Sequence, residues 1–322
     1  TMETQVDAEL CFSQLINTSC QKYELPHMKM MLVNSVLSFS VVFTVMMFFH
    51  FRQLHTPTNL LLLSLAVCDF LVGLLVMPVQ ILLIEPCWLL GDLVCVLYYF
   101  ITLVRVFASV LSMVLISVDR YVAICDPLRY STKFTLRTVK FCVLLCWIYS
   151  FFYSFLILLD NLKQPGRYKS CDGQCVININ RVVDLVLNFI LPISAIIILY
   201  VRVFVVAVSQ ARSMRSHVAA VKRQRSLTVT VQRSELKAAR TLGVTVFVFL
   251  ICYCPPYCIS IFGLDMKMSS LSTFFIFFLV SFNSCLNPVI YGFFYNWFRK
   301  CVKLIVMLQI LQPQSCQTDV LQ

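Results

Sequence analysis

The stretch "INRVVDLVLNFILPISAIIILYVRVFVVAV", from Ile179 to Val208, consists almost entirely of apolar side chains. About 20 such residues in an α-helix are enough to cross the hydrocarbon core of a bilayer. A backbone in lipid must satisfy its own hydrogen bonds, so a segment of this kind has to be helical. It therefore predicts a membrane-spanning helix, and within it lies an acid, Asp184, that lipid disfavours.

The composition of the whole chain points the same way. Its 322 residues are 60% hydrophobic and 13% charged, whereas soluble domains are about half apolar and about a quarter charged. The 7 glycines exclude a glycine-rich fibrous chain or linker. Lipid is thus the expected solvent for most of the chain.

Seven apolar runs of spanning length occur between residues 28 and 294. They extend from about Met28 to Phe49, Asn59 to Ile84, Leu93 to Tyr121, Val139 to Leu159, Ile179 to Val208, Lys237 to Phe262 and Leu271 to Phe294. The sequence therefore predicts an all-α membrane protein with a seven-helix bundle over residues 28–294. Residues 1–27 precede the bundle, and residues 295–322 are predicted to form a short amphipathic helix and a tail.

Lysine and arginine gather in three segments that share one side of a seven-span bundle: residues 129–140, 209–240 and 299–303. Because positive loops stay in the cytoplasm, the N-terminus is predicted to be extracellular. Asn17, in the sequon Asn17-Thr18-Ser19, is then a predicted glycosylation site. The net charge of +11 reflects this asymmetry and the nearby anionic lipid, and no nucleic-acid partner is expected.

Three charged side chains lie well inside the predicted spans: Asp69, Arg105 and Asp184. At about 1.5 Å of rise per residue, Asp69 and Arg105 each lie roughly 15 Å from a span end, near the midplane. Their equal depth predicts a buried ion pair. Asp184 lies about two turns or less from its outer end, so this pairing leaves it without a cation at its own depth.

Several arrangements would account for Asp184. It can form a salt bridge to Arg181 on the same helix, or to Lys163 or Lys169 in the outer loop. As a protonated acid it can share a hydrogen bond with Asn188, four residues further on. The functional interpretation is a cation site, because an acid at membrane depth that faces an outer cavity is a site for positive charge. The residues alone leave all of these open.

Four motifs recur together in the predicted spans. Asp119-Arg120-Tyr121 ends the third span, Asn287-Pro288-Val289-Ile290-Tyr291 lies in the seventh, "LAVCD" ends at Asp69 in the second, and Pro192 lies in the fifth. Together they resemble the rhodopsin-like (class A) G-protein-coupled receptors, and the resemblance covers nearly the whole chain.

Further segments narrow the resemblance. "QLHTPTN" (Gln53 to Asn59), "NSCLNPVIYGFFYNWF" (Asn283 to Phe298), "CWLLG" (Cys87 to Gly91) and the pair Cys171 and Cys175 are similar to trace amine-associated receptors. This resemblance implies a plasma-membrane receptor for volatile or biogenic amines, of the kind found in olfactory cilia. It also implies a stimulatory G protein as partner and a rise in cAMP as output.

Two residues depart from the usual amine-binding pattern. The span-three acid of aminergic receptors is replaced by Thr102, seven residues after Cys95, and the span-seven tyrosine is replaced by Ser281. Asp184, eight residues before Pro192, stands where some fish trace amine-associated receptors carry an acid. The resemblance therefore implies that Asp184 binds the ammonium. The other expected ligand-binding residues are Asn188, Thr102, Leu103, Val106, Tyr253, Tyr257, Phe277, Ser281 and Tyr99.

The resemblance also implies roles in activation. Val110, Pro192 and Phe249 form a relay beneath the ligand, and Arg120 faces Glu235 in a lock that opens toward the G protein. The other residues expected in coupling are Asp119, Tyr121, Asn287, Pro288 and Tyr291. Arg105 stands near the usual sodium shell and is expected to replace sodium beside Asp69. The alternative is that its long side chain extends upward into the ligand cavity or to Asp184.

The resemblance further implies two disulfides. Cys95 is expected to pair with Cys175, and Cys171 with Cys20 rather than with Cys11.

Rival classes are less consistent with the sequence. A transporter or channel would also carry intramembrane charges, but no internal repeat is visible. An enzyme is not expected, because neither a Ser/His/Asp arrangement nor metal-ligand spacing occurs among the 4 histidines and 16 cysteines. No cofactor or metal is expected. Within receptors, loss of the span-three acid keeps a peptide, lipid or other non-amine ligand open.

Overall fold

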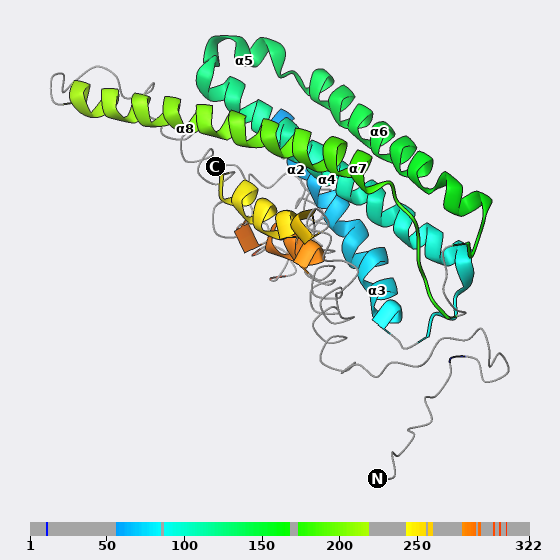
Figure 1. Cartoon of the computed structure of the whole chain (residues 1–322). Helices are drawn as coiled ribbons and strands as arrows, with labels where there is room; N and C mark the ends of the chain where they lie inside the picture. Colours follow the sequence, from blue (N-terminus) through cyan, green and yellow to red (C-terminus); the bar gives the residue numbers. More distant parts are fainter. Residues whose placement is uncertain are drawn as a thin grey trace, which may run out of the picture.

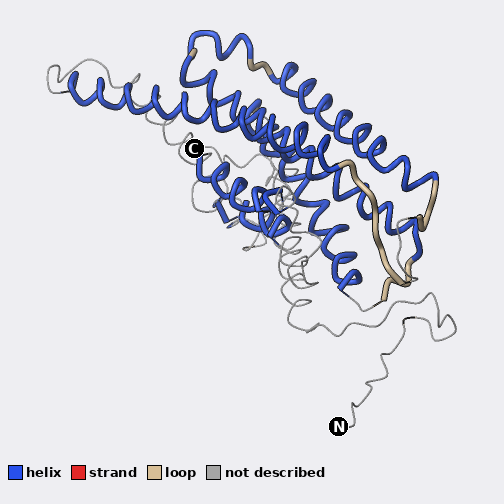
Figure 2. Tube along the Cα trace, viewed as in Figure 1, coloured by secondary structure: helices blue, strands red, loops and turns tan. Residues whose placement is uncertain are grey.

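The computed structural model of the chain describes residues 11, 56–84, 87–167, 173–218, 243–255, 257–259, 279–287, 289–290, 299, 303 and 307. The described residues form helices, turns and connecting loops, and none of them is in a strand (Figure 2). The prediction of an all-α fold is thus confirmed over this part of the chain.

The second span is one continuous helical stretch with a wider turn inside it. It consists of α2 (Pro57–Leu71), the π-helical segment η2 (Val72–Val76) and α3 (Met77–Ile84). The Thr56 side chain accepts a hydrogen bond from the Asn59 N–H at 3.3 Å, which caps the first turn. Pro57 follows at a position where its missing N–H costs nothing.

Helix α4 (Gly91–Cys125) is the central element of the bundle. It packs against α2, α6 (Leu136–Lys163) and α8 (Leu191–Val218), as Figure 1 shows. The core that forms around it includes Leu62 of α2, Met113 of α4 and Phe249 of the helix over residues 243–255, each at most 1% exposed. A helix in this position must bury side chains on several of its faces, and some of these buried side chains are polar.

Helix α6 lies at the edge of the described bundle. It follows the short α5 (Pro127–Lys133), and its first turn is capped by Thr135, whose side chain accepts from the Thr138 N–H at 3.2 Å. Its apolar side chains Phe152 and Leu156 are 60% and 64% exposed. Lipid is the solvent that such a face requires.

The fifth span contains an irregularity next to its acid. It runs without a break through α7 (Arg181–Asp184), the π-helical η3 (Leu185–Ile190) and α8. Pro192 follows η3 and lacks the N–H that an α-helix would use, so a wider turn before it is a common solution. The sequence predicted the span but not this π-turn.

Four helices among the described residues are long and apolar enough to cross a membrane: Pro57–Gln80, Gly91–Cys125, Leu136–Lys163 and Val182–Ser209. They correspond to the predicted spans two to five. A shorter apolar helix, Gly243–Ile259, falls within predicted span six. Predicted span one, most of span seven, and the segments 1–27 and 295–322, apart from isolated residues, lie outside the described residues.

Two disulfides lie at one end of the bundle, which we call the disulfide end. The structure joins Cys95 to Cys175, the pairing that the resemblance implied. It also joins Cys11 to Cys87, a pairing that the sequence did not predict. Cys20 and Cys171 lie outside the described residues, as does Asn17.

Candidate ligand site

Asp184 lies near the disulfide end, where α7 passes into η3. The Asn180 side chain caps this helix start by accepting from the Val183 N–H at 3.3 Å. Asp184 is partly buried, and its Oδ1 accepts a hydrogen bond from Asn188 Nδ2 at 3.0 Å. Asn188 is 5% exposed, so this bond fixes the direction of the carboxylate.

Tyrosines from two other helices lie near the carboxylate. The Tyr257 hydroxyl interacts with Asp184, and Tyr149 and Tyr153 of α6 lie within electrostatic reach of it. The rings of Tyr149 and Tyr153 are stacked, with centroids 5.5 Å apart. Phe189 stacks on Tyr257 at 4.4 Å. Aromatic rings near an acid add to its attraction for a cation when a ring face is open to the site.

No described lysine or arginine side chain forms an ion pair with Asp184. Lys163, one of the candidate partners, is exposed at the end of α6. Two other candidates, the Arg181 side chain and Lys169, lie outside the described residues. The hydrogen bond to Asn188 anticipated from the sequence is present, and it engages one of the two carboxylate oxygens.

The structure brings together only some of the predicted ligand residues. Asn188 and Tyr257 contact Asp184, whereas Tyr253 is 2% exposed and stacks on Phe249 at 4.3 Å. Ser281 is also buried and donates to Gln80 Oε1 at 3.4 Å.

The remaining predicted ligand residues lie along α4. Thr102 is buried near the Tyr98 hydroxyl, and Tyr99 packs edge-on against the Tyr98 ring at 5.2 Å. Leu103 is partly buried, and Val106 packs against the main core. Phe277 lies outside the described residues.

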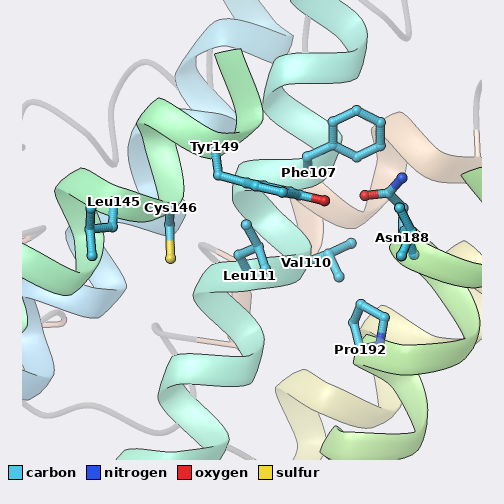
Figure 3. Close-up of a pocket in the computed structure, with 9 residues that line it drawn as sticks. Phe107, Val110, Leu111, Leu145, Cys146, Tyr149, Asn188 and Pro192 are labelled. Atoms are coloured by element: carbon cyan, nitrogen blue, oxygen red, sulfur yellow. The ribbon is translucent and has the colours of Figure 1, made fainter. Parts of the chain in front are cut away.

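A cavity of about 250 Å³ lies between α4, α6 and the η3–α8 helix, and Asn188, the hydrogen-bond partner of Asp184, lines it. Figure 3 shows the Tyr149 hydroxyl and the Asn188 side-chain oxygen pointing toward one another at one side of the group of lining residues. The lining residues are Phe107, Val110, Leu111, Leu145, Cys146, Tyr149, Leu187, Asn188 and Pro192. The sequence predictions for the ligand site included none of the α6 residues.

Tyr149 and Tyr153 had one signal in the sequence. They are four residues apart, which places them on the same face of a helix. The apolar residues around them are distributed evenly enough that this face was not distinguishable from the lipid-facing one. Only the packing of α6 against α4 identifies it.

The predicted ion pair between Asp69 and Arg105 is not formed. Asp69 Oδ2 accepts from Asn287 Nδ2 at 2.8 Å, and no ion pair within 4.0 Å joins the two described side chains. Arg105 is 2% exposed, and its Nε and Nη1 have no hydrogen-bond partner among the described residues. Its charge acts on Asp69 only at longer range. Equal depth was not enough to predict an ion pair, because depth does not determine how each helix is rotated about its axis.

At the opposite end of α4 lies a closed polar cluster. Asp119, with 0% of its side chain exposed, pairs with Arg120, whose Nε lies 2.9 Å from Asp119 Oδ2. Tyr130 donates to Asp119 Oδ1 at 2.8 Å, and Thr58 donates to Oδ2 at 3.2 Å. Glu235, the predicted partner of Arg120, lies outside the described residues. Within them, Asp119 holds Arg120.

Other residues expected in activation lie in the bundle core. Val110 and Phe249 belong to one buried cluster. Tyr121 packs against Ile124 and Val203. Pro288 and Tyr291 lie outside the described residues.

Tyr130→Phe is expected to weaken the hold on Arg120 modestly. Burial raises the pKa of the Tyr130 phenol, and the charge of Asp119 raises it further, so the hydroxyl stays protonated and donates at neutral pH. Loss of one such bond costs about 1 kcal/mol, or roughly fivefold in a two-state equilibrium. Basal signalling should rise by up to that factor. The control is Thr132→Val on the same short helix, because the exposed Thr132 hydroxyl donates to Arg129 O and to no other described residue. An equal rise in both variants would contradict the role of Tyr130.

Comparison with known proteins agrees with this architecture. Residues 39–291 match the model of the 7 transmembrane receptor (rhodopsin family). Trace amine-associated receptor 9 of Homo sapiens is 36% identical over 97% of this chain and 94% of its own length. Trace amine-associated receptor 8c of Rattus norvegicus is 36% identical over 98% of this chain and 97% of its own. Trace amine-associated receptor 13c of Danio rerio is 36% identical over 88% and 83%.

These matches extend along nearly the entire chain, and the helices they imply agree with the four membrane-crossing helices described above. The protein is therefore a multi-pass membrane receptor and not an enzyme, with a ligand and a G protein as its partners. The chain belongs to the trace amine-associated receptors, within the rhodopsin family of seven-transmembrane receptors.

Proposed function

We propose that this receptor binds a small amine through the carboxylate of Asp184. The single observation that carries the proposal is a partly buried acid, oriented by Asn188 and close to Tyr257, that forms no ion pair with any lysine or arginine side chain that the structure describes, a set that leaves out the side chains of Arg181 and Lys169. An ammonium would supply a positive charge at this acid. The names of the relatives, which are trace amine-associated receptors, support the same ligand class.

The surroundings of Asp184 favour an ammonium over a hydrated inorganic cation. Charge attraction grows as the local dielectric falls, and lipid and aromatic rings lower it around this acid. An ammonium N–H can donate to the carboxylate, and the tyrosine rings near this acid add attraction for the positive charge. Thr102 lacks the charge to compete for the ligand, so one acid would determine its orientation.

Binding would be coupled to the G protein through two states of the bundle. An amine changes the equilibrium only if it binds one state more tightly than the other. Asp184 directly precedes η3, the irregular segment before Pro192, where the helix can repack. At the other end, Arg120 would leave Asp119 and face a G protein. We assign a stimulatory G protein and cAMP as output, with an extracellular N-terminus glycosylated at Asn17 and a location in olfactory cilia.

The test compares amines with alcohols of the same shape. Cells that express the receptor are exposed to a panel of volatile and biogenic amines and to the corresponding alcohols, and cAMP is measured. Amines should activate the receptor and alcohols should not, because only the ammonium carries the charge that Asp184 requires. Activation by a neutral odorant alone would overturn the amine assignment. Solute flux without any G-protein response would favour the transporter interpretation.

A further inference from the structure

We infer that the cavity between α4, α6 and the η3–α8 helix holds the hydrocarbon part of the ligand, so that the receptor selects amines by the size of one apolar group. This inference rests on the proposed function, since it places the ammonium at Asp184. It adds the ligand class: monoamines with a single apolar substituent somewhat larger than a benzene ring.

The cavity and the acid share two side chains. Asn188 lines the cavity, and its Nδ2 donates to Asp184 Oδ1 at 3.0 Å. Tyr149 also lines it and lies within electrostatic reach of the same carboxylate. Figure 3 shows both polar groups at one side of the space, with Leu111 and Cys146 on the side away from Asn188. A molecule with its charge at Asp184 would thus project its apolar end toward Leu111.

The chemistry of the lining excludes a second charged group. Apart from the Tyr149 hydroxyl and the Asn188 amide, the walls are carbon and the Cys146 sulfur. A buried charge there would have no partner among the lining residues and would cost several kcal/mol. A diamine or an amino acid would therefore be disfavoured if its second charge entered this cavity. The site fits one ammonium and one hydrocarbon group.

The volume sets the size of that group. A cavity of about 150 Å³ holds benzene, and this one measures about 250 Å³. It therefore accommodates a phenylalkyl group or a medium-length alkyl chain. Its rim residues Leu145 and Leu187 are 47% and 40% exposed, so the space opens on the outer face of the bundle. Longer alkyl chains would extend between α6 and α8 into lipid, and each further methylene would add little binding free energy.

A series of linear primary amines of increasing length tests the inference. In the wild type, potency should rise roughly fourfold for each methylene that enters the cavity and then level off. Leu145→Trp narrows the cavity and should move the plateau to shorter chains, with at least about a tenfold loss for the longest active amine. Leu111→Ala enlarges it and should move the plateau to longer chains. The matched control is Leu144→Trp, because Leu144 is 56% exposed and does not line the cavity.

The outcomes separate the inference from the function on which it rests. Opposite shifts in the two cavity variants support the inference, and a misfolded receptor would not produce them. If amines activate the wild type through Asp184 but all variants keep one length profile, the cavity holds a lipid chain or nothing, and the inference fails alone. If no amine activates the wild type, the proposed function fails and the inference with it. Surface staining of each variant confirms that equal amounts of receptor are compared.

Discussion

Asp184→Asn is expected to reduce the potency of a monoamine by about 100-fold or more, with little change in surface expression. The substitution keeps the shape of the side chain and its capacity to accept from Asn188 Nδ2. It removes the negative charge, and loss of one member of a desolvated charge pair costs about 2–5 kcal/mol. The measurement is a cAMP concentration–response curve on cells with matched receptor levels.

The control for this prediction is another aspartate near the same end of the bundle. Asp160 at the end of α6 is 54% exposed and lies 3.9 Å from Arg167. Exposed pairs of this kind contribute at most about 1 kcal/mol. Asp160→Asn should therefore leave amine potency within about threefold of the wild type. Equal potency in wild type and Asp184→Asn would show that Asp184 does not bind the ligand. Any amine that activates the receptor would then have to bind another acid.

Asp119→Asn is expected to raise signalling in the absence of ligand by about tenfold or more. Asp119 is fully buried and accepts from Arg120, Thr58 and Tyr130. Removing one partner of a buried ion pair costs about 3–5 kcal/mol in the state that contains it. In the proposed two-state account, that state is the closed one, in which Asp119 pairs with Arg120. Loss of this ion pair should shift the population toward the open state, and basal cAMP should rise until the response of the assay is saturated.

The matched control is Asp126→Asn, seven residues further along the chain. Asp126 is 41% exposed, and two described cations, Arg129 and Lys133, lie 3.9 Å and 4.0 Å from it. Because solvent screens these pairs, basal cAMP should stay near the wild-type level. Unchanged basal cAMP in Asp119→Asn, at normal surface amounts, would show that this cluster does not restrain the receptor.

The spans were the most predictable part of the fold, because the length of an apolar run is written directly in the sequence. Leu93 to Tyr121 was predicted for the third span, and α4 extends from Gly91 to Cys125. The π-turn η3 was not predicted, since it depends on how Pro192 and the preceding turn settle against α4. The Cys11–Cys87 disulfide was missed because spacing does not determine which cysteines pair.

The candidate site was predicted in part, and the reason lies in helix rotation. Asp184 and Asn188 were identifiable as polar residues in an apolar run, four positions apart on one face. Tyr149 and Tyr153 were not identifiable, because apolar side chains occur on every face of α6 and no face stands out in the sequence. The same uncertainty produced the error at Asp69 and Arg105, which share a depth but not an ion pair.

The most direct test of the central claim is a double-mutant cycle between receptor and ligand. Binding of one amine and its alcohol analogue is measured with purified receptor in lipid discs, for wild type and Asp184→Asn. If the Asp184 carboxylate binds the ammonium, the substitution weakens the amine far more than the alcohol, with a coupling energy of about 2–5 kcal/mol. Equal weakening of both ligands, with a coupling energy below about 0.5 kcal/mol, would contradict the account.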